Sequence, residues 1–328
     1  MCIICGMSDF KVYLAPMDGV TDAPLREILC RHGGYDWCFS EFLRVTDDPL
    51  SEKSLLHDVP ELLSGGRTPD GTPLKVQLLG DNPAAMAKSA ILAVRQGALG
   101  IDLNFGCPSR FVHHSGSMLL KEPKLLYEIT STVRDAVADK VPLSVKIRSG
   151  FAFKTELPKI VEAVACEGVS EITIHCRTRR ELYRKEDLDW TVIAPLHERY
   201  PHVTFVANGE INSLEDALEC SKQSGCSVFM SGRGGLMVPN MGHTIKGSAG
   251  PYNNKQILVV LREVFLKFIE MKVEDRVVLA RAKQFAGYAR RDNEYMTEFF
   301  KGFCRCNDID RGLDIIDKAI EEFLNESK

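Results

Sequence analysis

The sequence predicts a TIM (β/α)8 barrel, an α/β fold, followed by a small C-terminal helical domain. Three observations support this prediction. Eight short β-rich or apolar runs follow one another between residues 12 and 232, helical patterns lie between most of them, and beyond about residue 250 only helical patterns remain. Strands that alternate with helices form right-handed βαβ units and a parallel sheet, and eight such units over about 240 residues have the size of this barrel.

Each expected strand is a run of six or seven residues rich in apolar or β-branched side chains. The runs are VYLAPM from residue 12, WCFSEFL from 37, LKVQLLG from 74, GIDLNFG from 100, PLSVKIR from 142, EITIHCR from 171, TFVANG from 204 and SVFMSG from 227. Amphipathic patterns predict helices over residues 22–33, 82–97, 122–138, 157–168 and 213–225. In the second helix, Ala87, Ala90, Ile91 and Val94 keep the spacing of one buried face, and Gly97 is the expected C-cap.

A doubly wound open sheet is the alternative arrangement of strands and helices. Its phosphate-binding signature GxGxxG is missing after the first strand, where the sequence reads APMDGVTDAP, so the barrel is favoured. The stretch GHTIKGSAGPYNN joins the barrel to helical patterns over residues 254–272, 276–291 and 312–326. We therefore expect a catalytic domain over residues 1–245 and a helical domain over residues 246–328.

Composition limits the compartment and the cofactors. The chain has 328 residues, of which 45% are hydrophobic. No apolar run approaches the ~18 residues of a membrane span, and the N-terminus lacks the pattern of a signal peptide, so we expect a cytoplasmic protein. The eleven cysteines are scattered, and the CxxC of Cys2 and Cys5 and the CxC of Cys304 and Cys306 lack the paired spacing of a zinc site. We expect reduced thiols and no metal.

The charge distribution restricts any nucleic-acid partner to a local surface. The net charge is −4, which is not that of a strongly basic nucleic-acid-binding domain. Residues 262–291 carry eight Lys/Arg against four Asp/Glu, a local net charge of +4. On charge alone this segment is as well explained by a solvated helix face.

Polar residues follow every expected strand. In this barrel the chemistry occurs at the carboxyl ends of the strands, and polar groups that converge there are costly unless a ligand or a neighbour bonds to them. After the last two strands the chain reads NGE and GRGG, where glycines allow backbone N–H groups to approach an anion and Arg233 supplies a cation. A phosphate-bearing ligand is therefore expected, and Lys146 on the same rim could stabilise negative charge. The residues at the strand ends are Pro16, Met17, Asp18, Glu41, Arg44, Gln77, Asn104, Cys107, Lys146, Arg148, His175, Arg177, Asn208, Gly209, Glu210, Gly232, Arg233 and Gly234.

These residues, in this order, resemble the tRNA-dihydrouridine synthases over nearly the whole chain. The matching motifs are LAPMDGVTDAPLRE, VQLLG, DLNFGCPS, SVKIR, HCRTRRELYRKEDLDW, VANGEI, SGRGGL and RAKQFAGYAR. The resemblance implies an FMN-dependent enzyme that reduces the 5,6 double bond of a uridine in tRNA, with NADPH as the hydride source. The last motif is most similar to the bacterial C-type subgroup, which acts on position 16 of the D-loop.

The resemblance also implies roles for most of the strand-end residues. Cys107 corresponds to the catalytic acid. The flavin-binding positions are Pro16, Met17, Asp18, Gln77, Lys146, His175, Asn208, Gly209, Glu210, Gly232 and Arg233, and the RNA-binding positions are Arg44, Asn104, Arg148, Lys283 and Arg290. The resemblance thereby makes residues 262–291 an expected RNA surface, and we expect the protein to be a monomer.

The chemistry explains why a cysteine would follow the fourth strand. Hydride delivered to carbon 6 of uracil leaves enolate-like charge, which a proton at carbon 5 must quench from the face away from the flavin. A free cysteine with an ordinary pKa of ~8.5 stays protonated near neutrality and can supply that proton. Gly106 is expected to let the chain turn beside the ring, and Pro108 to stiffen it.

Two departures from the family pattern concern the fit of the target base. The loop after the cysteine, RFVHHSGSMLLKEP, is shorter than the usual glycine- and alanine-rich loop and carries His113 and His114. Glu181 and Leu182 stand where glutamine and glycine are expected.

Three other functions are compatible with parts of the sequence. An FMN-dependent barrel that reduces a small enone-like molecule would use the flavin residues but not the helical domain. A flavin-free lyase would use Lys146 to form a Schiff base. A tRNA-binding protein without turnover would not need the Cys107 thiol.

Overall fold

The structure is a computed structural model that describes residues 9–109 and 114–325, with side chains to residue 323. Cys2, Cys5 and His113 lie outside the described residues.

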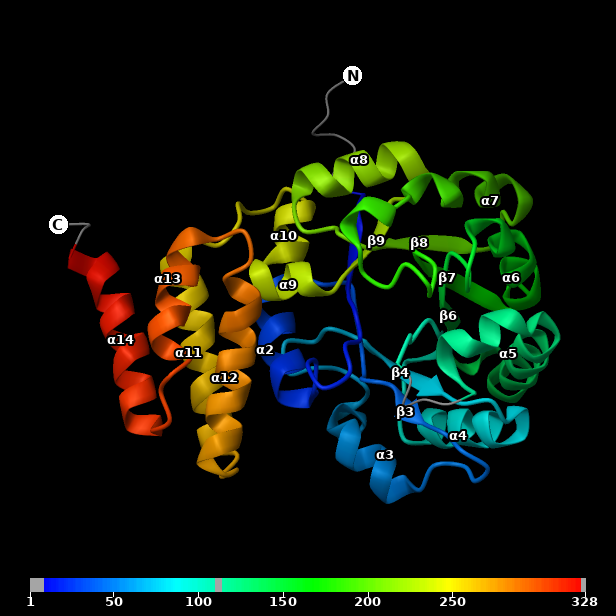
Figure 1. Ribbon diagram of the computed structural model, residues 1–328. Coiled ribbons are helices and arrows are strands. Elements are labelled where there is room, and N and C mark those ends of the chain that lie inside the picture. Colours follow the sequence, from blue (N-terminus) through cyan, green and yellow to red (C-terminus); the bar gives the residue numbers. More distant parts are fainter. Residues whose placement is uncertain (1–8, 110–113, 326–328) are drawn as a thin grey trace.

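The expected barrel is confirmed. Eight parallel strands form one closed sheet, because β1 pairs with both β2 and β9, and β2 pairs with β4 through Cys38↔Leu74 and Phe39↔Lys75 (Figure 1). The two-residue strand β3 (Leu43–Arg44) extends the pairing with β4. The eight barrel strands are β1 (Lys11–Leu14), β2 (Trp37–Phe39), β4 (Leu74–Leu79), β5 (Gly100–Phe105), β6 (Leu143–Arg148), β7 (Val169–His175), β8 (Thr204–Asn208) and β9 (Val228–Ser231).

The amino-terminal end of the barrel interior is filled, so the barrel is not a pore. Lys75 forms an ion pair with Glu171, and the Tyr13 hydroxyl donates a 2.7 Å hydrogen bond to the same carboxylate. The Lys75 ammonium lies 5.2 Å from the ring centre of Trp37 and 5.6 Å from that of Phe39. This packing leaves the carboxyl ends of the strands as the place for a ligand.

Helices cover the outside of the barrel. Side-chain caps start several of them: Asp22 accepts from the Leu25 N–H and Asn82 from the Ala85 N–H. The second expected helix ends at Arg95, and Gly97, just beyond it, has a φ of 100°. The helices are α2 (Ala23–Gly33), α3 (Glu52–Asp58), α4 (Pro83–Arg95), α5 (Pro123–Val137), α6 (Leu157–Val164), α7 (Ala194–Arg199) and α8 (Leu214–Ser224), with short 3-10 helices at Pro60–Ser64, Gly116–Lys121, Ala138–Lys140, Lys154–Glu156, Lys185–Asp187 and Trp190–Ile193.

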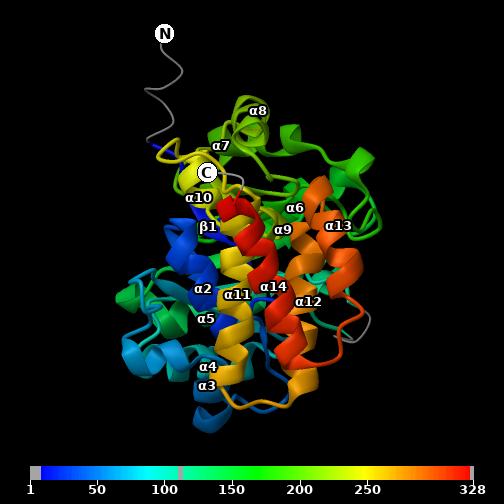
Figure 2. The ribbon, with the colours of Figure 1, turned by 90° about the vertical axis from the view of Figure 1, so that its left-hand side faces the viewer.

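The rest of the chain is helical, as expected. In Figure 2 the last four helices stand side by side, and α11 packs against α2 of the barrel as well as against α12 and α14. The expected domain boundary at residue 245 falls at the end of α10. These helices are α9 (Arg233–Met237), α10 (Met241–Ile245), α11 (Asn254–Glu270), α12 (Asp275–Ala289), α13 (Glu294–Phe303) and α14 (Ile309–Asn325).

Helix α13 was not expected from the sequence. It starts with a side-chain cap, because Asn293 accepts from the Met296 N–H, and it buries Met296 and Phe303. Only two of its ten residues are fully buried, and its aromatic-rich sequence has no strong intrinsic preference for a helix. Its formation therefore depends on packing against α12 and α14. None of the described helices is both long and apolar enough to cross a membrane.

Candidate active site

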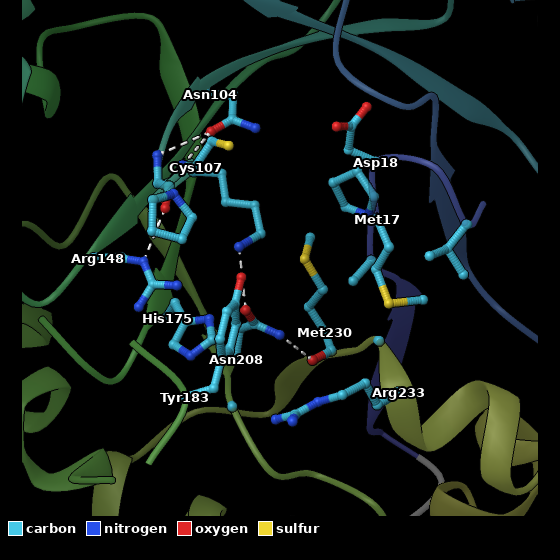
Figure 3. Close-up of a pocket in the computed structure, with 18 of the residues that line it drawn as sticks. Met17, Asp18, Asn104, Cys107, Arg148, His175, Tyr183, Asn208, Met230 and Arg233 are labelled. Atoms are coloured by element: carbon cyan, nitrogen blue, oxygen red, sulfur yellow. Dashed lines mark hydrogen bonds between the residues drawn. The ribbon is translucent and has the colours of Figure 1, made fainter. Parts of the chain in front are cut away.

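A cavity of about 540 Å³ opens at the carboxyl ends of the barrel strands (Figure 3). This volume lies within the range of cofactor and substrate pockets. Arg44, Lys283 and Arg290 do not line the cavity. The lining includes Cys107, Asn104, Arg148 and all eleven residues expected to bind a flavin: Pro16, Met17, Asp18, Gln77, Lys146, His175, Asn208, Gly209, Glu210, Gly232 and Arg233.

The loop that carries Cys107 is fixed by Asn104, the last inward-facing residue of β5. The Asn104 side-chain oxygen accepts hydrogen bonds from the N–H of Gly106 (2.9 Å) and of Cys107 (3.0 Å). From the other side, the Ser117 hydroxyl donates to the Cys107 carbonyl at 2.7 Å. The turn therefore depends on side-chain hydrogen bonds that hold the backbone of the cysteine.

The expected reason for Gly106 was wrong. A Cβ added at Gly106 would meet other atoms no closer than 3.5 Å, and this glycine is not among those with positive φ. The turn thus requires neither the conformational freedom of glycine nor the absence of a side chain within the protein itself.

A buried carboxylate lies behind Asn104. The Asn104 amide donates to the Gln77 oxygen at 2.8 Å, and the Gln77 amide donates to Asp102 at 2.7 Å. Asp102 is fully buried, and the Ser144 hydroxyl donates to its second oxygen at 2.6 Å. This series of hydrogen bonds fixes the orientation of the Asn104 and Gln77 side-chain amides. Sequence reasoning missed Asp102, although it alternates with Asn104 on the inward face of β5.

Burial and nearby cations set the protonation of the central groups. Burial, with a contribution from Arg148, lowers the pKa of Lys146 to about 8, and the Lys146 ammonium donates to Asn208 at 3.2 Å. Burial, together with the charges of Arg148 and Lys146, holds the pKa of His175 well below its ordinary value, so this imidazole is neutral at pH 7. Its Nε2 is buried and has no hydrogen-bond partner among the described residues.

The Cys107 thiol remains protonated at neutral pH. Burial raises the pKa of Cys107 above its ordinary value, and the nearby Asp18 carboxylate adds to that shift. Figure 3 shows Cys107 and Arg148 on one side of the cavity and Met17 and Asp18 on the other. The thiol therefore faces the cavity as a neutral acid.

The far end of the cavity combines glycines with paired arginines. Arg233 donates to Glu210, and Arg177 lies 3.2 Å from the same carboxylate. Gly209 has a φ of 124°, and a Cβ there would lie 3.0 Å from Leu188, so the position requires glycine. This end offers close backbone approach and cations to an anionic group.

Arg148, which was expected to contact RNA, is almost fully buried in the protein. It is 1% exposed and donates to the carbonyls of Gly106 (2.9 Å), Thr178 (3.1 Å) and Leu182 (2.8 Å). It thereby ties the Cys107 loop to the loop after β7. Tyr183, which sequence reasoning missed, projects from that second loop, with its ring 5.8 Å from that of His175.

Several cations of the basic segment 262–291 have partners within the protein. The segment spans α11 and α12, and the pairs are Arg262 with Asp317, Lys267 with Glu27 and Arg281 with Asp22. Lys283 donates to the Cys306 carbonyl, and the exposed Arg290 lies 4.5 Å from the Phe300 ring. Arg44 is exposed on β3. Two further α12-side residues that sequence reasoning missed, Tyr288 and Arg291, line the cavity.

None of the described cysteines forms a disulfide. The described residues also contain no group of three or more His, Cys, Asp or Glu side chains that could hold a metal ion.

The structure is that of a TIM-barrel enzyme that acts on a ligand held at the strand ends. Its closed parallel barrel has a polar mouth, with a protonated thiol in the cavity and an end that can accept an anion. Residues 13–315 match the family model described as dihydrouridine synthase, and the chain belongs to this family. The family consists of FMN-dependent oxidoreductases that reduce uridine in tRNA with NAD(P)H, which confirms the resemblance found in the sequence.

Curated relatives cover almost the whole chain. A tRNA-dihydrouridine(16) synthase of Haemophilus influenzae is 38% identical over 301 residues, which make up 90% of this chain and 96% of the relative. The protein of the same name from Escherichia coli K12 is 37% identical and covers 94% of this chain and 98% of its own length. That from Shewanella oneidensis is 40% identical over 86% of this chain and 89% of its own.

A solved structure shares the fold alone. Histamine dehydrogenase from Rhizobium sp. 4-9 is 12% identical, with a TM-score of 0.55, and the match covers 77% of this chain and 48% of that one.

Proposed function

We propose that this dihydrouridine synthase reduces uridine 16 in the D-loop of tRNA, with NADPH as reductant and Cys107 as the proton donor. The observation that carries the proposal is a protonated, cavity-facing cysteine in a chain about 38% identical to tRNA-dihydrouridine(16) synthases over nearly its full length. We further propose that it works as a monomer in the cytoplasm.

The cavity residues fit FMN. The buried Nε2 of neutral His175, which has no partner in the part of the chain that the structure describes, can bond to a polar group of the ligand. The glycine at position 209 permits close approach of the backbone, and Arg233 can bind a phosphate with donors not directed at Glu210. In this proposal Gln77 and Lys146 contact the ring, Pro16, Met17 and Asp18 line it, and His175, Asn208, Gly209, Glu210, Gly232 and Arg233 surround the tail and phosphate.

The chemistry divides between the cofactor and the protein. When bound in this cavity, FMN in its reduced form would supply the hydride for carbon 6 of the uracil. Cys107 then donates its proton to carbon 5, which neutralises the charge that develops on the pyrimidine. Asn104 and Ser117 hold the backbone of the cysteine so that the thiol keeps its position. The raised pKa of Cys107 keeps the proton available at the pH of the cell.

The uridine must leave its stack in the folded tRNA to reach this cavity. Extrusion of a base costs a few kcal/mol, which phosphate contacts must offset. We propose that Asn104 and Arg148, which line the cavity, contact the extruded nucleotide, and that Arg44, Lys283 and Arg290, which lie outside it, contact the RNA around it.

The test combines product mapping with a thiol variant. The FMN-loaded protein is incubated with NADPH and unmodified tRNA, and dihydrouridine is mapped by position. Cys107→Ala should lower its formation by about 100- to 10,000-fold, the usual contribution of a general acid, while flavin reduction by NADPH persists. Cys166→Ala, a half-buried cysteine that does not line the cavity, is the matched control. Unchanged product formation in Cys107→Ala would exclude the acid role, and product at another position would exclude uridine 16.

A further inference from the structure

One face of α12 is directed at the barrel rather than at solvent. Arg281, Gln284 and Tyr288 are spaced i, i+3 and i+7, so they lie on the same side of the helix. Tyr288 lines the active-site cavity, and the other two side chains contact the turn after β1. In Figure 1 the helical bundle that contains α12 stands beside α2, the helix that follows that turn. The motif RAKQFAGYAR, found in the sequence, therefore has a face toward the barrel in addition to Lys283 and Arg290.

The contacts between α12 and the turn are numerous and short. The Arg281 guanidinium donates to the carbonyls of Gly19 (2.8 Å) and Val20 (2.7 Å) and forms a 2.7 Å ion pair with Asp22. Gln284 donates a second hydrogen bond to the Gly19 carbonyl at 2.9 Å. The Arg281 side chain is 14% exposed and stacks over the Phe268 ring at 5.3 Å. The planar guanidinium of Arg281 is thus held in an orientation that lets it donate to both carbonyls of the turn.

The turn forms one wall of the active-site cavity. Pro16, Met17, Asp18 and Val20 all line the cavity. The barrel itself anchors other parts of the turn, since Glu41 accepts from the Val20 N–H at 3.0 Å. The Arg26 guanidinium, in turn, donates to the Thr21 carbonyl at 2.8 Å.

The outermost part of this wall is held by the turn itself as well as by α12, since the Met17 carbonyl accepts from the Val20 and Thr21 N–H groups, each at 2.9 Å. Gly19 is exposed and has a φ of 70°, a conformation that glycine adopts readily. Within the described residues, the Gly19 and Val20 carbonyls accept hydrogen bonds from the side chains of α12.

We propose that Arg281 is a positioning residue for the flavin site: through the Gly19–Val20 carbonyls it fixes the wall that carries Met17 and Asp18. The helical domain then has a part in cofactor binding as well as in binding RNA. The inference rests on the FMN site of the proposed function, but not on uridine 16 or on the acid role of Cys107.

The test measures FMN affinity and backbone protection rather than turnover. Arg281→Met is compared with Arg276→Met, which changes an 81% exposed arginine of the same helix that is paired with neighbouring Glu274. Loss of several charge-assisted hydrogen bonds to the turn should weaken FMN binding to the flavin-free protein by about tenfold or more. Amide exchange in residues 17–22 should accelerate in the flavin-free Arg281→Met protein and remain as in wild type in Arg276→Met.

Two further measurements separate positioning from a general loss of structure. Arg281→Lys, which keeps the charge but not the fork, should restore part of the FMN affinity. Amide exchange in β4–β8 should be unchanged in Arg281→Met. Wild-type FMN affinity and wild-type exchange in residues 17–22 would overturn the proposal, as would faster exchange throughout the barrel. Because no arm of this test reads dihydrouridine, its failure is distinguishable from failure of the proposed reaction.

Discussion

The lowered pKa of Lys146 predicts an unusual pH dependence of stability. Its ammonium lies in the cavity wall, where burial and Arg148 lower the pKa from 10.5 to about 8. In the unfolded chain the side chain regains its ordinary pKa, so between these two values the unfolded state binds more protons than the folded state. Stability therefore rises with pH across this window as far as Lys146 is concerned. The full difference corresponds to about 3 kcal/mol of unfolding free energy.

The assay is urea unfolding of the flavin-free protein and of Lys146→Met at about pH 7.5 and about pH 9.5. Other titrating groups are common to both proteins, so the difference between their unfolding free energies isolates Lys146. Relative to the variant, the wild type should gain about 2 kcal/mol between the two pH values, since part of the linkage lies above the upper pH. A constant difference would mean that the pKa is ordinary. If the unfolding free energy of the wild type instead fell relative to that of Lys146→Met as the pH rose, the folded protein would stabilise the charged form of Lys146. That result would refute the account of this site.

Two further predictions concern the loops around the cavity. Arg148→Met should lower the unfolding free energy by about 3 kcal/mol, because the carbonyls of Gly106, Thr178 and Leu182 lose a buried donor; urea unfolding checks this. Unchanged stability with lost tRNA turnover would make Arg148 solely an RNA contact. Leu182 is half exposed and has a φ of 54° where the family pattern has glycine, so Leu182→Gly should raise the melting temperature slightly, by relief of about 1 kcal/mol of backbone strain. A lower melting temperature would show that the leucine side chain, through its packing, outweighs the strain.

The local patterns of the chain were sufficient to predict the barrel. Eight apolar runs, most of them separated by amphipathic helices, can bury their faces in few other ways, and the closed sheet follows from their number and spacing. Helix α13 was missed because its stability comes from partners distant in sequence rather than from its own residues. The strand-end rule similarly predicted all the cavity positions assigned to FMN, since every carboxyl end of a closed parallel barrel meets at one mouth.

The sequence by itself determined the fold, the family and the residues at the barrel mouth, because each depends on the order and spacing of side chains along one strand or loop. The tertiary structure alone decided how those residues are used. Local sequence patterns do not reveal that Asp102 orients Gln77, that Arg148 donates hydrogen bonds to two loops, or that Arg281 of α12 bonds to the turn after β1. Arg281 and Gly19 are 262 residues apart, and a hydrogen bond over such a separation exists only once α12 has packed against the barrel.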